Sequence, residues 1–158
     1  MNYIQVFNRG EPAAASYADD LVHLPRWGEP EWRKLFARTQ EQLARASEFV
    51  IQRGAEDRAL CFVAAGALEV GTSYVDGMSM SPLAKIAAGS VVGEQSFFDG
   101  MPRSANVWVM SDATLLKLPF DQYQAFAREE PLLTMELLFA LGRVLSVRLR
   151  NTTVRIRR

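Results

Sequence analysis

The side chains best suited to ligand chemistry lie in residues 90–109, which read S-V-V-G-E-Q-S-F-F-D-G-M-P-R-S-A-N-V-W-V. Gly93 and Glu94 are adjacent there, and beyond a short spacer Pro102 and Arg103 are adjacent. A guanidinium fits phosphate oxygens with two parallel hydrogen bonds, whereas an ionised carboxylate is an acceptor that suits a hydroxyl. A ligand that is anionic at one end and hydroxylated at the other, such as a ribose phosphate, would therefore satisfy both side chains.

The backbone around these side chains also favours an anion. Gly93 allows a positive φ or a close approach of the chain to a ligand. The amides that open the short helix expected after Gly93 have no partner within that helix, so they can face an anion. Ser104 adds a hydroxyl and one more amide beside Arg103. We therefore expect a short helix and turn, inserted between two β-strands, that hold the carboxylate and the guanidinium on their two arms.

The same two charged residues also have a purely structural interpretation. A half-buried ion pair between Arg103 and Glu94 would hold the turn together without any ligand. The chain would then be an interaction scaffold rather than a ligand-binding module. The two interpretations predict different geometry, because a direct Arg103–Glu94 bridge without a cavity favours the scaffold.

The order and spacing of these residues resemble the phosphate-binding cassette of the cyclic nucleotide-binding domain. This is the family of catabolite activator proteins, protein kinase A regulatory subunits and cyclic nucleotide-gated channels. Its cassette reads roughly F-G-E-(L/I)-(A/G)-L, a short spacer, and then (P)-R-(A/S/T)-A. The chain departs from it at Val92, where an aromatic residue is usual, and at Gln95-Ser96, which replaces an aliphatic–small pair. The matching positions are Gly93, Glu94, Pro102, Arg103, Ser104 and Ala105.

The resemblance implies a role for each cassette residue. Arg103 would neutralise a cyclic phosphate, and Glu94 would accept a hydrogen bond from the ribose 2′-hydroxyl. The amides of Ser96, Ser104 and Ala105 would complete the phosphate cradle. The predicted site therefore comprises Gly93, Glu94, Gln95, Ser96, Pro102, Arg103, Ser104 and Ala105.

The residue that follows Arg103 indicates which base the bound nucleotide would carry. In the family, cyclic-GMP binders often carry threonine there, and serine is common in bacterial cyclic-AMP receptors. Ser104 therefore implies cyclic AMP rather than cyclic GMP. The aliphatic runs at 60–64 and 68–70, with Ile86 and Val92, could line the base pocket or belong to the ordinary core.

Short β-strands broken by turn residues surround the cassette. Gly54, Gly66 and Gly89 mark turns, and residues 74–81, with the pair Asp76-Gly77, indicate a loop or hairpin turn. Such spacing is typical of a β-sandwich or barrel. Apolar and β-branched runs predict the strands 48–52, 60–64, 68–72, 83–87, 106–110 and 113–119, and residues 42–46 could be a strand or a helix remnant.

The segment before the strands is predicted to be partly helical. Residues 13–24 could form a short helix, and Pro30 opens another that runs to about Ala37. The only histidine, His23, has no second histidine or cysteine nearby in the sequence. We therefore expect a surface side chain there and no metal site.

Two helices are predicted after the strands. Asp121 is expected to cap a helix over 122–129, and Pro131 opens a longer one that runs to about Asn151. Strands followed by helices indicate an α+β order. The apolar positions of the longer helix recur at helical spacing at Leu133, Leu137, Leu141, Val144 and Leu145.

The surface of the last helix offers two functional features. Arg143 or Arg148 could stack on adenine as a cation on a π face, but solvated surface positions are the stronger expectation. Apolar residues occupy more than one face of residues 132–149. One stripe would pack on the strands, and another could form the seam of a homodimer. In the family this helix swings over the base or pairs subunits.

The chain after Leu141 contains arginines and no acids. Cations near a helix C-terminus complement its dipole, and a patch for nucleic acid or a membrane surface is the alternative. The chain stops where transcription factors of the family add a helix-turn-helix, so DNA recognition by this chain alone is not expected. The arginines are Arg143, Arg148, Arg150, Arg155, Arg157 and Arg158.

The whole arrangement resembles the cyclic nucleotide-binding fold over about residues 32–149. This implies an α+β, mainly β, architecture. We expect a double-stranded β-helix or jelly-roll-like β-roll of eight strands, with a leading helix and two C-terminal helices. The chain then divides into an N-terminal extension (1–31), a cyclic nucleotide-binding domain (32–151) and a basic tail (152–158).

Composition fits a single domain with its own core, at 158 residues. The 18 Lys and Arg residues balance 18 Asp and Glu residues, so no overall basic field favours nucleic acid as a partner. The single cysteine, Cys61, lies in an apolar run and is expected to be a buried structural thiol in a reducing compartment. No signal peptide or long apolar window is present, so we expect a cytoplasmic protein without a membrane partner.

No catalytic constellation, metal-ligand spacing or P-loop motif occurs in the sequence, so an enzyme is not expected. The sequence predicts a bacterial, cytoplasmic cyclic nucleotide sensor or regulatory module that needs no metal. Its output would be an unidentified protein partner or its own dimerisation, through movement of the C-terminal helix. The alternatives are a scaffold with a vestigial cassette and a fragment of a Crp/Fnr-type transcription regulator.

Overall fold

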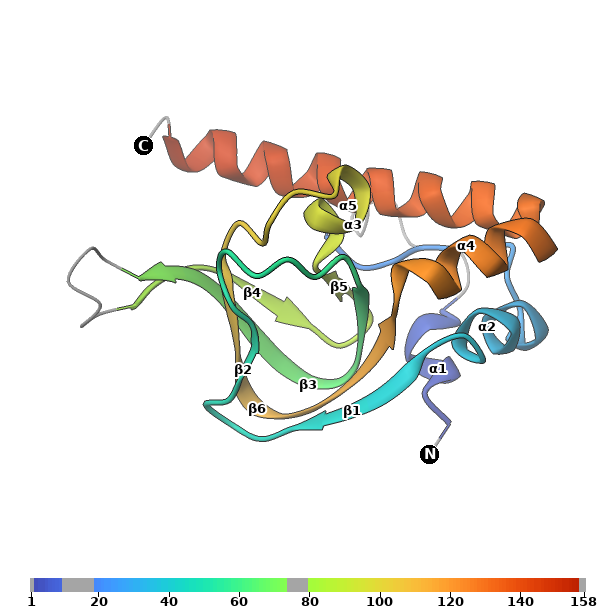
Figure 1. Cartoon of the computed structure of the whole chain (residues 1–158), viewed down its shortest axis with the longest axis horizontal. Coiled ribbons are helices and arrows are strands. Elements are labelled where there is room, and N and C mark those ends of the chain that lie inside the picture. The colour runs from blue at the N-terminus through green and yellow to red at the C-terminus, as the bar shows by residue number, and fades with distance from the viewer. Residues whose placement is uncertain (1, 10–18, 74–79, 157–158) are drawn as a thin grey trace.

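The computed structural model describes residues 2–9, 19–73 and 80–156, in which a curved sheet lies beneath a long C-terminal helix (Figure 1). Two helices precede the sheet, a short one interrupts it, and two follow it. This order confirms the predicted α+β architecture with a leading helix and two C-terminal helices. The helices are α1 (Ile4–Phe7), α2 (Glu29–Phe36), α3 (Glu94–Asp99), α4 (Phe120–Glu129) and α5 (Pro131–Ile156).

The strands form one antiparallel sheet that wraps around its inner face, as predicted for a β-roll (Figure 1). They are β1 (Gln40–Ala44), β2 (Phe49–Ile51), β3 (Leu60–Ser73), β4 (Met80–Ala87), β5 (Val91–Val92) and β6 (Asn106–Leu118). The order is β1-β6-β3-β4, with β2 added to β6 and β5 added to β3. The loop predicted at 74–81 lies, up to residue 79, outside the described residues.

The two central strands are continuous where the sequence predicts a break in each. Gly66 has a φ of +83°, and the register of β3 against β6 shifts on both sides of it, so it forms a β-bulge rather than a turn. A Cβ at this position would lie 2.5 Å from the carbonyl oxygen of Asp112, which leaves room only for glycine. Likewise, β6 joins the predicted strands 106–110 and 113–119. The described residues therefore form six strands rather than the expected eight.

Alternate residues of β3 enter two different hydrophobic cores. Leu60, Phe62 and Ala64 pack in the core that includes helix residues. Cys61 and Val63 belong to a second core made by the strands. Residues 60–64 are apolar throughout because side chains alternate along a strand and both faces of β3 are buried here. Cys61 is buried, as predicted, and burial raises the pKa of its thiol to about 11.

The C-terminal helices differ from the prediction at their ends. α4 begins at Phe120 with Pro119 as its N-cap, so the predicted cap at Asp121 is wrong. α5 continues beyond its predicted end at Asn151 to residue 156. Among the described residues, no helix combines the length and the apolarity that crossing a bilayer requires. The predicted inward face of α5 is confirmed, with Leu137, Leu141 and Val144 fully buried.

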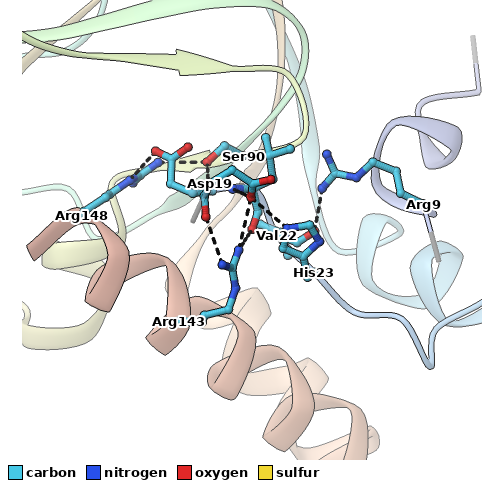
Figure 2. Close-up of polar contacts among 9 residues, drawn as sticks. Arg9, Asp19, Val22, His23, Ser90, Arg143 and Arg148 are labelled. Atoms are coloured by element: carbon cyan, nitrogen blue, oxygen red, sulfur yellow. Dashed lines mark hydrogen bonds and ion pairs between the residues drawn. The ribbon is translucent and has the colours of Figure 1, made fainter. Parts of the chain in front are cut away.

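Residues 19–24, called the N-terminal strap below, form no helix. The helix predicted over 13–24 is therefore wrong for these residues, and its first part lies outside the described residues. Only 8% of the His23 side chain is exposed, and its Nε2 lies 2.9 Å from Oδ1 of Asp19. The predicted surface position of His23 is wrong because the strap packs between α5 and the turn before β5 (Figure 2).

Candidate functional site

Gly93 begins the cassette in a conformation that other residues avoid. Its φ is +83°, and it is the N-cap of α3. A Cβ on Gly93 would lie 2.6 Å from Nη1 of Arg103 and 2.9 Å from the carbonyl oxygen of Ala59. Glycine is therefore required here for two reasons: only glycine adopts this φ readily, and a side chain would collide with the Arg103 guanidinium.

Arg103 is a buried cation with an unsatisfied donor. Its side chain is fixed by hydrogen bonds from Nη1 to the carbonyl of Gly93 (2.9 Å) and from Nη2 to the carbonyl of Ala59 (2.7 Å). The residue is only 4% exposed, yet its buried Nε has no hydrogen-bond partner within the described residues. Buried donors in proteins are nearly always satisfied. The orphaned Nε therefore indicates a position where a ligand acceptor belongs.

Asp57 balances part of the Arg103 charge. Its Oδ2 lies 3.5 Å from Nη2 of Arg103 and 3.4 Å from Nζ of Lys117. Burial alone would raise the pKa of Asp57. The amide of Ala59 and the two cations outweigh this effect and hold the pKa below its ordinary value. The carboxylate is therefore ionised at neutral pH and keeps the guanidinium in place.

Glu94 is also buried, at 8% exposure, but it does not pair with Arg103. Its Oε1 accepts a hydrogen bond from Nη1 of Arg148, at 2.8 Å. Arg103 instead pairs with Asp57. The direct Glu94–Arg103 bridge expected for a purely structural turn is absent, because the two side chains have different partners on different elements.

Arg148 connects α5 to three other segments. Its Nε donates to Oδ2 of Asp20 (3.0 Å), and its Nη2 donates to Oγ of Ser90 (3.0 Å) and to the carbonyl of Val91 (2.7 Å). Burial alone would lower the pKa of Arg148, but Glu94 and Asp20 outweigh that effect and raise the pKa above its ordinary value. The expectation of a solvated arginine here is therefore wrong.

Arg143 lies more than one helical turn before Arg148 on α5, and it is not solvated either. Its Nη1 donates to the carbonyl of Asp19 at 3.0 Å, and its Nη2 donates to the carbonyl of Leu21. The strap thus supplies the acceptors for Arg143, which the sequence could not indicate.

A cavity of about 720 Å³ opens between the cassette, the roll and α5. Every predicted site residue except Pro102 lines it. Val70, Ile86 and Val92 supply an apolar wall, whereas the run 60–64 belongs to the cores. The volume falls within the range typical of pockets for drug-sized ligands. From outside the cassette the lining includes Asp19, Asp20, Lys85, Leu145, Arg148, Leu149, Asn151 and Thr152.

The cavity therefore has a polar end and an apolar wall. The polar end carries Arg103, Glu94 and Arg148, and the hydroxyl of Ser104 there donates to Oε1 of Gln95. Such a combination suits a molecule with an anionic group, hydroxyls and one flat apolar part. Within the described residues, no group of His, Cys, Asp and Glu side chains is arranged to hold a metal ion.

The cassette is packed directly on α4. Phe97 of α3 is buried, with its ring centroid 4.9 Å from that of Tyr123 and 5.7 Å from that of Phe120. Arg58 donates from Nε to the carbonyl of Phe97 and lies 3.7 Å from the Phe120 ring centroid. A shift of α3 would therefore move α4 as well.

Three acidic residues of the site were missed by the sequence analysis. Asp57 precedes β3, and Asp19 and Asp20 lie in the strap. None belongs to the cassette pattern, and only folding brings them to Arg103, Arg143 and Arg148. No local signal in the sequence could have found them.

The fold and the site together define a nucleotide-binding module of the β-roll class. The family profile of the cyclic nucleotide-binding domain matches residues 41–130. The match spans more than half of the chain, which belongs to the cyclic nucleotide-binding domain family. No curated protein matches the sequence significantly.

Solved structures agree with this assignment. A cyclic nucleotide-binding domain from Methylobacillus flagellatus KT aligns with a TM-score of 0.80 at 23% identity, over 98% of this chain and 82% of that one. The catabolite activator protein of Thermus thermophilus aligns with a TM-score of 0.72 at 25% identity, over 87% of this chain and 62% of that one. The c-di-GMP-responsive global regulator of Xanthomonas campestris aligns with a TM-score of 0.75 at 20% identity, over 83% of this chain and 64% of that one. The chain spans less than two thirds of the latter two proteins.

Proposed function

We propose that the chain binds cyclic AMP in this cavity and acts as a sensor that reports occupancy through α5. The observation that carries the proposal is the buried, unsatisfied Nε of Arg103, a residue that lines the cavity. A cyclic phosphate would supply the missing acceptor and a negative charge. Arg103 then binds the phosphate, and Glu94 accepts a hydrogen bond from the ribose 2′-hydroxyl.

The remaining cassette residues shape the phosphate cradle. The amides of Ser96, Ser104 and Ala105 donate to the phosphate, while Gly93 forms the turn and Gln95 is the second residue of the helix beside it. Pro102 restricts the residue before it, Met101, to an extended backbone. Ser104 favours cyclic AMP over cyclic GMP, and the wall of Val70, Ile86 and Val92 takes the base.

Signalling follows from the position of Arg148. A ligand shifts a conformational equilibrium only when it binds the two conformations with different affinity. A ribose hydroxyl that donates to Glu94 shares the carboxylate that Arg148 binds through Oε1, so it changes the contact that holds α5. The output is a change in how α5 packs, which a protein partner or a second copy of the chain reads in the bacterial cytoplasm.

A second copy of this chain fits the outer face of α5. Apolar side chains are exposed there, and that of Phe139 is 83% exposed. The exposed positions alternate three and four residues apart, which is the spacing of a two-stranded helical seam. They are Leu132, Met135, Phe139, Gly142, Ser146 and Leu149.

Isothermal titration calorimetry with cyclic AMP and cyclic GMP tests the proposal. The wild type should bind cyclic AMP with micromolar affinity and cyclic GMP more weakly. Arg103→Ala should weaken binding by about a hundredfold or more, because it removes a charge-assisted pair of hydrogen bonds. Arg103→Lys, which keeps the charge but not the fork, should also bind weakly.

Arg128→Ala is the control, because it removes an exposed arginine on α4. Its affinity should equal that of the wild type, and circular dichroism checks that every variant is folded. The absence of heat with either nucleotide, at protein concentrations well above micromolar, would contradict the proposed function and favour a scaffold.

A further inference from the structure

The N-terminal strap is attached to the turn before β5. The amide of Val22 donates to the carbonyl of Gly89 at 3.0 Å, and Oγ of Ser90 donates to the carbonyl of Asp20 at 2.6 Å. Arg9 reaches the strap from the other side, with Nη2 2.8 Å from the carbonyl of Val22 (Figure 2). The strap is therefore held through its own main-chain groups at a fixed place beside the cavity.

Two arginines of α5 bind this fixed strap. Figure 2 shows Arg143 and Arg148 projecting from α5 toward it. Arg143 donates to the carbonyls of Asp19 and Leu21, and Arg148 forms an ion pair with Asp20 at 3.0 Å. Since the strap is attached to the roll, these contacts fasten α5 to the roll as well.

Asp20 and Glu94 share one guanidinium. Nε of Arg148 donates to Asp20, and Nη1 of Arg148 pairs with Glu94 at 2.8 Å. A planar guanidinium that is held at Nε and Nη2 presents Nη1 in one direction only. The Asp20 contact therefore fixes the direction from which Arg148 meets Glu94. Both Asp20 and Arg148 lie outside the residues 41–130 that match the family.

We infer that Asp20 is a positioning residue of the pocket: it holds Arg148 against Glu94 and thereby fixes α5 beside the cavity. The strap thus sets the geometry of a carboxylate that lies far from it in sequence. The part of the inference that concerns Glu94 and a ligand rests on the proposed function, whereas the part that concerns α5 does not.

Hydrogen exchange of the full chain without nucleotide tests the hold on α5. Asp20→Asn removes the charge that pairs with Nε of Arg148 but keeps the shape of the side chain. Amides of residues 144–151 should exchange about tenfold faster than in the wild type, the scale expected for one lost charge-assisted hydrogen bond. Unchanged exchange in this part of α5 overturns the inference.

Asp121→Asn is the matched control, because Asp121 lies on α4 and, among the residues that the structure describes, accepts a hydrogen bond only from the adjacent amide of Gln122. Its exchange should equal that of the wild type. If Asp20→Asn does not fold, Ser90→Ala takes its place, because it removes the Oγ that contacts both the strap carbonyl and Arg148. It should give the same faster exchange in α5, and the absence of that change would overturn the inference.

The link to Glu94 is tested by comparing cyclic AMP with its 2′-deoxy analogue. The wild type should prefer cyclic AMP, and Asp20→Asn should reduce this preference severalfold, because Glu94 is no longer held in place. A general loss of stability would weaken both ligands equally and leave the ratio unchanged, and that result overturns the link. If the wild type binds neither nucleotide, the proposed function fails, and the exchange comparison alone decides whether Asp20 holds α5.

Discussion

Arg103 and Glu94 face one cavity, but each is neutralised by a different partner. Asp57 lies 3.5 Å from Arg103, and Arg148 lies 2.8 Å from Glu94. Asp57 is half exposed, so water and salt screen its attraction for Arg103 more than they would within a buried pair. A phosphate that accepts directly from the buried guanidinium therefore competes well with Asp57. The role of Asp57 is to keep Arg103 aimed at the cavity.

The ion pair between Asp57 and Arg103 makes the free energy of unfolding depend on pH. Asp57→Asn keeps an acceptor for the amide of Ala59 and loses the charge. The pKa of Asp57 is lowered in the folded protein, so its carboxylate stabilises the fold above the unfolded-state pKa of about 3.9. This contribution is lost as the pH falls through the folded-state pKa. The variant should be less stable than the wild type by up to about 1 kcal/mol at neutral pH, as for a partly exposed pair.

Urea denaturation at several pH values measures this difference, which should shrink as the pH falls below the unfolded-state pKa and vanish once the carboxylate is protonated in the folded protein. Glu56→Gln is the control, because Glu56 is an exposed neighbour that forms no ion pair within the described part of the chain. A destabilisation by Asp57→Asn that stays constant across the pH range would show that the charge of Asp57 is not what matters.

At the scale of elements, α5 has three faces with three environments. Leu137, Leu141 and Val144 are buried in the core, which contributes about 1.5–3 kcal/mol for each large apolar side chain. A second face, with Leu145 and Arg148, borders the cavity. The third face carries the exposed apolar stripe. One helix therefore borders the core, the cavity and the proposed dimer seam.

The exposed face of α5 predicts a dimer that depends on Phe139. Phe139→Asp places a charge in the middle of the apolar stripe, where it would have to be buried unpaired in the seam. Sedimentation velocity should show dimer for the wild type and monomer for the variant. Leu43→Asp, which makes the same kind of change at an exposed residue of β1, should remain dimeric. A wild type that is monomeric at tens of micromolar would contradict the dimer.

At the scale of the whole molecule, features fixed by neighbouring residues could be predicted from sequence. The turn at Gly93, the short helix after it and the inward face of α5 depend on local backbone angles and periodicity, and the structure has them. Gly66 shows the limit of such reasoning. A glycine with positive φ serves a turn or a β-bulge equally well, and only the pairing of β3 with β6 decides between them.

Features that depend on partners from distant segments could not be predicted. Arg148 reads as a surface residue because a polar side chain is buried only where other elements supply acceptors. Those acceptors come from the strap, β5 and α3. For the same reason the sequence pattern indicated Arg103 and Glu94 but not the residues that orient them, Asp57 and Asp20.

The central claim is that a cyclic nucleotide occupies the cavity through Arg103. The most direct measurement is the nuclear magnetic resonance signal of the Arg103 Nε–H group, in isotope-labelled protein titrated with cyclic AMP. Because this group has no acceptor within the described residues, a phosphate hydrogen bond should shift its proton strongly downfield and slow its exchange with water. If cyclic AMP saturates the protein and this signal does not move, the nucleotide binds elsewhere and the account is contradicted.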